Sequence, residues 1–582
     1  METGMNVNVE IARSGCHTLK VFHENKEFYL HSKYNPIREA EVWVAENYEK
    51  GKMFVLIGFG LGYYAKALLA KLGEQDRILI IEPHKQIFNK AVETGISEIF
   101  EDNRVFLCLE NDREKLGQIL RILILEQRLK NSKIIISPNY EKICSTNTII
   151  NNLKKAFIDY AVDINTKLNQ ASSWQQNYLK NIKSSMKSCP ITEFENQFNC
   201  PVVIVGAGPS LNKELENLKR IYGQALIISS GTASTVLIKN NVRPHVIVSI
   251  DGHIANYNHF KEVNYKGIPL FYSPNSQYKI VEGHEGHKVV FQWSGVDVSD
   301  WYDELIGFQT GIIKVGPSVA NFALDIAYKM TNGPICFIGQ DLGFAGGYSH
   351  AEGNINRIKV DDVKKSSLIP VESNDGSELY TDYSFTLMRE WFENYLEMYP
   401  RNNVFNATLS GAKIKGTQAI QFEKFILEYC GSPTHVAQMI DNIIAAWQQK
   451  HRTDNIRTDK IFNEMLVCLN KVIKLAQKAR VVSDKLLNKV KNNDHNGIDR
   501  LLAKLTGIDD SITELKGKDS LLYFIMQTVN DILALWDEED SNEYKKRIKI
   551  AEKSCFFYKK LYEMSNEVRK ILQDMEAGGG HG

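Results

Sequence analysis

The stretch PVVIVGAGPSLNKELENLKR at residues 201–220 restricts the possible folds of this chain more than any other. Apolar β-forming residues run into Gly206 and Gly208, which are followed by Pro209, Ser210 and a stretch with helical spacing of leucines. This order predicts a strand, a tight turn and a helix. Such turns often bind phosphate, because glycines let backbone N–H groups approach an anion and the helix N-terminus attracts it.

The same alternation continues through the middle of the chain. Strands are predicted at Ala225–Ser229, His245–Ile250 and Ile335–Ile338, and within IPLFYSPNS and HKVVFQWSG. Strands that alternate with helices predict a mostly parallel sheet covered on both faces, with ligands bound beyond the carboxyl ends of the strands. Polar residues near the predicted strand ends should therefore lie together at the opening of one ligand crevice: Ser210, Thr232, Asp251, Ser273, Asn275 and Asp341.

A second glycine turn lies near the N-terminus, in MFVLIGFGLGYYAKALLAKL. The predicted strand Phe54–Ile57 leads into Gly58, Gly60 and Gly62, and Glu82 ends the next predicted strand. An acidic residue at that place commonly binds ribose hydroxyls in Rossmann-type folds, so one interpretation is a nucleotide or S-adenosylmethionine site. The other, which we favour, is a Rossmann-like scaffold whose glycines only permit tight strand–helix packing.

A chain of 582 residues is too long for one ordinary core, and about two to four domains are expected. We predict an α/β protein with three domains: a Rossmann-like domain at 1–165, a central domain with a parallel sheet at 170–430, and an α-helical domain at 431–582. The last assignment rests on helical periodicity in IFNEMLVCLNKVIKLAQKARVVSDKLLNKV, where Met465, Leu469, Val472, Ile473 and Ala476 lie three or four apart.

Composition excludes several classes of function. Lys plus Arg equals Asp plus Glu, at 70 each, so charge gives no reason to expect nucleic acid as a partner. No segment offers the roughly 18 consecutive apolar residues of a membrane span, and no secretory signal is visible. The nine cysteines are scattered without a CxxC pair, which favours reduced thiols in the cytoplasm. HEGH at 284–287 lacks an obvious third ligand, so we expect no metal site there.

The most informative stretches are GAGPSL at 206–211 and GPSVANFALDIAYKMTNGPICFIGQDL at 316–342. Together with VRPHVIVSIDG and with NATLSGAKIKGTQ at 406–418, they resemble the motility accessory factor (Maf) family of flagellin glycosyltransferases. The central domain of that family is similar to bacterial sialyltransferases that use CMP-activated sugars. The resemblance also implies the three-part layout, with a Rossmann-like domain before the centre and helices after it.

The resemblance implies a reaction. A nonulosonic acid, of the pseudaminic, legionaminic or sialic acid type, would pass with inversion from its CMP-activated donor to a Ser or Thr hydroxyl of flagellin. The resemblance implies no further cofactor, and the sialyltransferase-like route needs no metal in principle, because oriented backbone donors can replace a cation at the leaving phosphate; the sequence itself leaves the metal requirement open. Residues expected to contact the donor are Gly206, Gly208, Pro209, Ser210, Thr232, Asn275, Gly316, Ser318, Gly339 and Tyr348.

The catalytic base is not fixed by the resemblance. The sialyltransferases use a histidine in a segment similar to SELYTDYSFTLMREWF, where this chain has none and Asp382 is the nearest carboxylate. His350, Asp251 and Asp341 are the other candidates for general base catalysis. Each has a structural alternative: the aspartates can cap helices, and His350 can be a surface loop residue.

Three other functions remain open. A pterin-type pyrophosphokinase would use ATP and magnesium with a similar glycine turn, although such enzymes are much shorter. A non-catalytic flagellin-binding export factor would use the C-terminal helices alone. A methyltransferase would bind S-adenosylmethionine at Gly58–Glu82, where the sequence supplies no catalytic motif.

Overall fold

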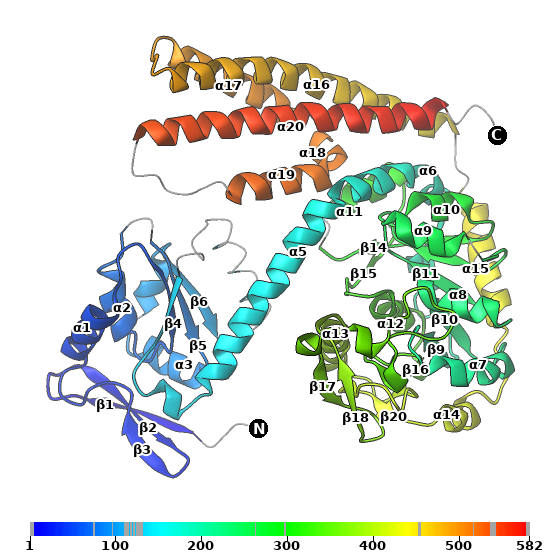
Figure 1. Ribbon diagram of the computed structural model, residues 1–582, viewed down its shortest axis with the longest axis horizontal. Helices are drawn as coiled ribbons and strands as arrows, with labels where there is room; N and C mark the ends of the chain where they lie inside the picture. Colours follow the sequence, from blue (N-terminus) through cyan, green and yellow to red (C-terminus); the bar gives the residue numbers. More distant parts are fainter. Residues whose placement is uncertain are drawn as a thin grey trace. The chain divides into compact units, whose positions relative to one another are not determined.

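A computed structural model of the chain describes residues 5–73, 76–95, 97–109, 132–261, 263–295, 298–451, 455–515, 517–535 and 543–577, with single positions at 116, 119 and 123. Its residues form two compact units. The first comprises 1–169, 484–496 and 527–557, and the second comprises 170–483, 497–526 and 558–582. Each unit is described by itself below, and Figure 1 shows the order of their elements.

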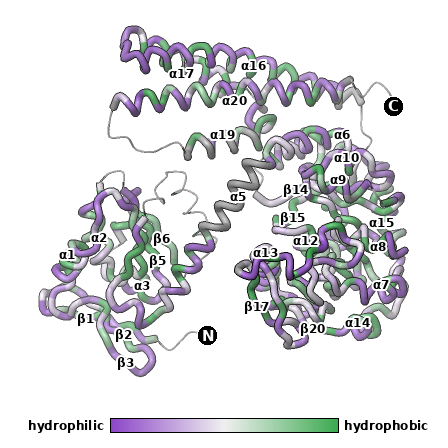
Figure 2. Tube along the Cα trace, in the orientation of Figure 1, coloured by the Kyte–Doolittle hydropathy of each residue, from purple (hydrophilic) through white to green (hydrophobic). Residues whose placement is uncertain are grey.

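The first unit contains a four-stranded parallel sheet in the order β6-β5-β4-β7. Alternate residues of β4 face opposite ways: Phe54 and Leu56 enter one core, whereas Val55 and Ile57 enter the other. The sheet is therefore covered on both faces, and Figure 2 shows its strands as hydrophobic. The strands of this sheet are β4 (Met53–Ile57), β5 (Ile78–Glu82), β6 (Val105–Leu109) and β7 (Ser132–Ile136), and the helices between them include α2 (Tyr63–Leu69) and α3 (Lys85–Glu93). Before them in the chain, β1 (Asn6–Ile11), β2 (His17–His23) and β3 (Lys26–Tyr29) form a separate antiparallel sheet, which is followed by α1 (Pro36–Asn47).

The second unit contains a nine-stranded sheet whose strand pairs are all parallel, in the order β20-β19-β16-β9-β10-β11-β12-β13-β8. The prediction of parallel sheets in both α/β regions is confirmed. Its strands are β8 (Cys189–Pro190), β9 (Val202–Val205), β10 (Leu226–Ser230), β11 (Val246–Ser249), β12 (Leu270–Tyr272), β13 (Lys288–Val290), β16 (Ile335–Ile338), β19 (Val404–Asn406) and β20 (Gln418–Ala419). Two small sheets pair β14 (Gln292–Trp293) with β15 (Ile312–Ile313) and β17 (Ile369–Glu372) with β18 (Glu378–Thr381).

Helices cover both faces of this large sheet. Val202 and Ile204 of β9 belong to one core, whereas Val203 and Val205 belong to the other. The helices are α6 (Ile182–Ser185), α7 (Leu211–Arg220), α8 (Gly231–Lys239), α9 (Ile254–Phe260), α10 (Tyr278–Gly283), α11 (Ser299–Ile306), α12 (Val319–Met330), α13 (Tyr383–Met398), α14 (Phe422–Tyr429) and α15 (Val436–Lys450). Residues 170–180 of the long helix α5 (Thr146–Lys180) also belong to this unit.

The order of the strands creates a switch point beside β9. From β9 the chain proceeds to β10, β11, β12 and β13 on one side, and then returns to place β16 on the other side. The loops that follow β9 and β16 therefore leave the sheet in opposite directions. In open parallel sheets this divergence forms the crevice in which ligands bind.

The C-terminal region is helical, as the periodicity predicts. It contains α16 (Asn455–Lys491), α17 (Ile498–Thr513), α18 (Lys518–Leu521), α19 (Tyr523–Leu535) and α20 (Glu543–Ala577). The apolar residues that lie three or four apart in α16 are buried: Met465, Leu469, Val472, Ile473 and Ala476 are at most 7% exposed. Among the residues that the structure describes, no helix is both long enough and apolar enough to cross a membrane.

Candidate active site

The turn after β9 and the loop after β16 are bonded to each other at the switch point. The N–H of Gly206 donates to Ile338 O at 2.8 Å, and the N–H of Gly208 donates to Gly339 O at 2.7 Å. The backbone N–H and the hydroxyl of Ser210 both donate to Oδ2 of Asp341, at 3.2 and 2.8 Å. An anion that binds at this turn must therefore replace the Asp341 carboxylate on the two Ser210 donors.

This close approach explains the glycines. A Cβ at position 206 would lie 2.5 Å from Gly339 O, and a Cβ at position 208 would collide with Oδ2 of Asp341. Gly339 has φ +62°, in the left-handed region that favours glycine. Pro209 lies in the turn itself, where its carbonyl accepts the N–H of Asn212 at 3.4 Å. These residues bring the two loops into contact whatever ligand they bind.

Asp341 is a buried acid that is only partly satisfied. It is 1% exposed, and burial raises its pKa to about 6 although the hydrogen bonds from Ser210 act in the opposite direction. Within the described part of the chain, its Oδ1 has no hydrogen-bond partner, and neither have Oε1 of Gln340 and Nδ2 of Asn406. Gln340 and Asn406, which sequence reasoning did not select, lie at the ends of β16 and β19. Buried polar atoms of this kind are expected to find a partner in a ligand or in water.

His350 also lies beside the switch point. The N–H of the next residue, Ala351, donates to Ala207 O of the turn at 2.8 Å. Burial lowers the pKa of His350 below its usual range, although a hydrogen bond with the Asn356 backbone and the carboxylate of Asp382 act in the opposite direction. Asp382 is the N-cap of α13, since its side chain accepts the N–H of Phe385 at 2.9 Å. The structure thus brings His350 near both the turn and Asp382, a proximity that the sequence did not reveal.

The contacts of Ser349 are compatible with a proton on Nδ1 of His350. The Ser349 hydroxyl accepts the N–H of Ile358 at 2.9 Å and donates to Asn356 O across a long 3.4 Å. It can therefore accept from Nδ1 of His350, which lies 2.9 Å away. A proton on Nδ1 leaves the lone pair on Nε2, which is the form that a general base requires.

In the other loop predicted to bind the sugar donor, Gly316–Ser318, the polar groups of Ser318 cap helix α12. The N–H and the hydroxyl of Ser318 both donate to Oδ1 of Asn321, at 3.0 and 2.7 Å. The N–H of Asn321 returns a bond to Ser318 Oγ at 3.4 Å, which completes a capping box at α12. Gly316 is required here, because a Cβ would lie 2.5 Å from that of Asn321.

A cation that sequence reasoning missed lies on the predicted phosphate-binding tyrosine. The guanidinium of Arg357 is 3.6 Å from the ring centroid of the half-buried Tyr348. The same loop reaches α8, since the amide of Asn354 donates to Thr232 O at 3.5 Å. Tyr348 therefore shares one loop segment with His350, this segment contacts Thr232 of α8, and Arg357 places positive charge beside Tyr348.

Asp251 and Asn275 belong to a different part of the sheet edge. Asp251 is exposed, and its Oδ1 accepts the N–H of His253 at 2.8 Å. Asn275 is 1% exposed, and its Oδ1 has no partner among the described residues. The amide of Asn177 in α5 joins the two loops by donating to Gly252 O and Asn275 O at 2.9 and 3.2 Å. The loop that follows Asp251 and the carbonyl of Asn275 are therefore bonded to α5, and the hydrogen bonds of Asp251 itself stay within its own part of the sheet edge.

In the first unit, backbone N–H groups of the glycine turn donate to the carboxylate of Glu82. Oε2 of Glu82 accepts the N–H groups of Phe59 and Gly60 at 2.9 and 3.3 Å and the hydroxyl of Tyr140 at 2.5 Å. Glu82 is fully buried, its Oε1 accepts the N–H of His84 at 2.9 Å, and burial raises its pKa to about 7. The carboxylate that a nucleotide site would offer to ribose is thus bonded to the turn, which favours the scaffold interpretation.

The HEGH segment makes ordinary structural contacts. The ring of His284 is buried, and its Nε2 lies 2.8 Å from Ile268 O. Burial lowers the pKa of this histidine to about 4. His287 lies 3.6 Å from the carboxylate of Asp441 instead of joining His284.

Comparisons with known proteins agree with this architecture. Residues 176–347 match the family model described as 6-hydroxymethylpterin diphosphokinase MptE-like. The solved structure of a Maf glycosyltransferase from Magnetospirillum magneticum AMB-1 is similar to this chain with a TM-score of 0.57 and 15% sequence identity, over 98% of this chain and 95% of that one. A search of curated proteins finds no match. The chain therefore has the fold of a Maf glycosyltransferase over nearly its whole length, with an MptE-like domain at its centre.

Proposed function

We propose that this protein is a glycosyltransferase that moves a nonulosonic acid from its CMP-activated form to a Ser or Thr hydroxyl of flagellin. The observation that carries the proposal is the switch point, where the turn at Gly206–Ser210, the segment Gly339–Asp341 and the loop that carries His350 meet. The likeness to a Maf glycosyltransferase supports the reaction class. The acceptor protein and the sugar type follow from the motif resemblance.

The donor phosphate would bind where Asp341 now bonds to Ser210. A phosphate oxygen can replace Oδ2 of Asp341 on the two Ser210 donors, which lie before the N-terminus of α7. A second negative charge beside Asp341 raises the pKa of that acid further. Because this pKa is already about 6, donor binding near neutral pH should protonate Asp341, which then donates to the phosphate.

Positive charge for the leaving group would come from the loop that follows β16. Arg357 lies over Tyr348, so a phosphate near the tyrosine hydroxyl would also approach a guanidinium. With Ser210, these groups provide the oriented donors that stabilise developing charge in a transition state. We therefore propose that transfer requires no metal, and that it continues in the presence of a chelator.

His350 is the proposed general base. Its Nε2 removes the proton of the acceptor hydroxyl as the oxygen attacks the anomeric carbon, while the bond from that carbon to the CMP oxygen breaks and CMP leaves. The attack comes from the face opposite the leaving group, so configuration inverts. The nearby Asp382 carboxylate favours the imidazolium that forms.

A second candidate function follows from the central family match. A pterin diphosphokinase would transfer diphosphate from ATP with magnesium, and the MptE-like model covers residues 176–347. That match spans the turn after β9 and the segment after β16, so it uses the same switch point. The two candidates differ in their nucleotide: CMP for sugar transfer, and ATP with magnesium for diphosphate transfer.

The test is an assay of the purified protein with flagellin and CMP-activated pseudaminic, legionaminic and N-acetylneuraminic acids. We expect one donor to increase the intact mass of flagellin by one sugar residue with release of one CMP. His350→Asn should lower the rate by about 10²- to 10⁴-fold, the usual contribution of a general base. His287→Asn, at a side chain that is 40% exposed and lies outside the switch point, is the matched control. Absence of transfer from all three donors, together with turnover of ATP and a hydroxymethylpterin, would support the second candidate.

A further inference from the structure

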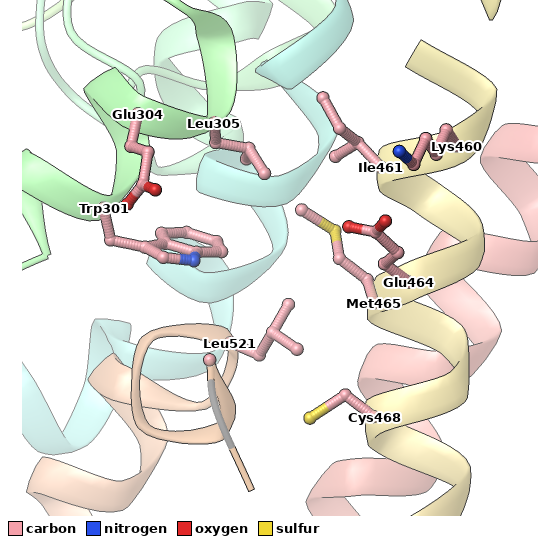
Figure 3. A pocket seen from close by; sticks show the side chains of 10 residues that line it. Trp301, Glu304, Leu305, Lys460, Ile461, Glu464, Met465, Cys468 and Leu521 are labelled. Carbon is pink, nitrogen blue, oxygen red and sulfur yellow. The ribbon is translucent and has the colours of Figure 1, made fainter. Parts of the chain in front are cut away.

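A pocket of about 540 Å³ lies within the second unit, away from the residues of the candidate active site (Figure 3). Its walls come from α11, α16 and α18, three elements that are far apart in the sequence. The volume falls within the range of roughly 300–1,000 Å³ that is usual for ligand sites. The helical stretch that begins at Ile461 contributes Ile461, Glu464, Met465 and Cys468 to it, whereas the two glycine turns do not line it.

The inner surface of the pocket is apolar. Met465 and Leu521 are 5% and 2% exposed, and Leu305 completes the wall on the side of α11. Trp301 belongs to the same α11 wall, and Figure 3 shows its indole directed across the cavity toward Met465 of α16. A side chain that enters the pocket can therefore bury an aliphatic stem of several carbons against apolar groups.

The outer part of the pocket is acidic. Glu304 on α11 and Glu464 on α16 line it from facing helices, and both residues are exposed. Across the described residues, neither carboxylate forms a salt bridge with a basic side chain. Lys460 is the basic residue of the lining and lies one turn before Glu464, and within the described ranges of the chain it forms no ion pair within 4 Å. The lining therefore presents two acids and one base around an indole, a combination that favours a cation.

We propose that this pocket binds an arginine or lysine side chain, together with an apolar neighbour, on a segment of a partner protein. The cationic head would lie near Trp301 between Glu304 and Glu464, where the indole attracts a cation through its face. Val467 is 55% exposed and lies three positions after Glu464 on α16, so it neighbours that carboxylate on the helix surface and offers an apolar contact that suits a polypeptide better than a free metabolite. The proposal does not depend on sugar transfer.

The test uses two dipeptide probes of equal shape: Nα-acetyl-arginyl-leucinamide and its citrulline analogue, which lacks the charge. The full-length protein carries 5-fluorotryptophan, and Trp301→Phe assigns the ¹⁹F signal of Trp301 among the seven tryptophans. We expect the arginyl probe to shift the Trp301 signal with saturation in the millimolar range. Glu464→Gln should weaken this binding by about two- to fivefold, as for a partly exposed ion pair.

Asp484→Asn provides the matched control, because it removes a negative charge from an exposed position of the same helix outside the pocket. It should leave the affinity of the arginyl probe unchanged. Three results would overturn the proposal: equal binding of both probes, equal weakening by the two charge variants, or no shift of the Trp301 signal at saturating probe. If Trp301→Phe fails to fold, calorimetry of both probes with the wild type and Glu464→Gln gives the same comparison.

Discussion

Replacement of Asp341 by asparagine should stabilise the protein at neutral pH. Burial raises the pKa of this carboxyl from its ordinary 3.8 to about 6, which corresponds to about 3 kcal/mol of unfavourable ionisation in the folded state. The folded protein binds the proton more tightly than the unfolded chain, so stability falls as pH rises from about 4 to about 6 and stays low above that. The asparagine oxygen can accept both Ser210 donors, and its amide replaces an Oδ1 that has no partner in the described part of the chain.

Scanning calorimetry of both proteins from pH 4 to pH 8 measures this effect. For the large second unit, about 3 kcal/mol corresponds to a rise in Tm of roughly 4 °C, which is an upper limit because buried sites relax. We expect the variant to melt higher at pH 7 and the difference to vanish near pH 4. A difference in Tm that does not change with pH, or a variant that is less stable at pH 7, would refute the assignment of Asp341 as a buried, costly charge.

Three further substitutions test other parts of the account. Asp382→Asn keeps an N-cap acceptor but removes the charge that raises the pKa of His350. The acid limb of the pH–rate profile should therefore move to lower pH. An acid limb that stays at the same pH would exclude His350 as the base. Tyr140→Phe removes a hydrogen bond to the buried carboxylate of Glu82 and should lower stability by about 1–3 kcal/mol in urea unfolding, without effect on nucleotide affinity. Ser318→Ala breaks the capping box of α12 and should cost about 1 kcal/mol; a much larger loss of activity than of stability would instead indicate that Ser318 contacts the donor.

Local patterns were sufficient to predict most elements of the fold. The run of buried β-formers before Gly206 does form β9, and the alternation of strands and helices does form a parallel sheet covered on both faces. Parallel strands place their carboxyl ends at one edge, which is why Ser210 and Asp341 could be expected near each other although 131 positions separate them.

Contacts made by tertiary structure could not be predicted in this way. Nothing in the sequence shows that β16 lies beside β9. This pairing brings the carboxylate of Asp341 within hydrogen-bond distance of Ser210 in the glycine turn. The approach of His350 to Asp382 depends on an irregular loop that has no periodicity to interpret. Likewise, Glu82 occupies the place expected for a ribose ligand, but its bonds to the N-terminal turn appear only in three dimensions.

The most direct test of the central claim is calorimetric titration of the purified protein with CMP, ATP plus magnesium, and S-adenosylmethionine. Ser210→Ala tests the site without adding bulk, and Gly208→Val blocks it, because a Cβ there would collide with Asp341. The account predicts binding of CMP that is weakened by Ser210→Ala and lost in a folded Gly208→Val variant. Binding of ATP with magnesium at this turn, with no heat from CMP, would contradict sugar transfer and favour diphosphate transfer.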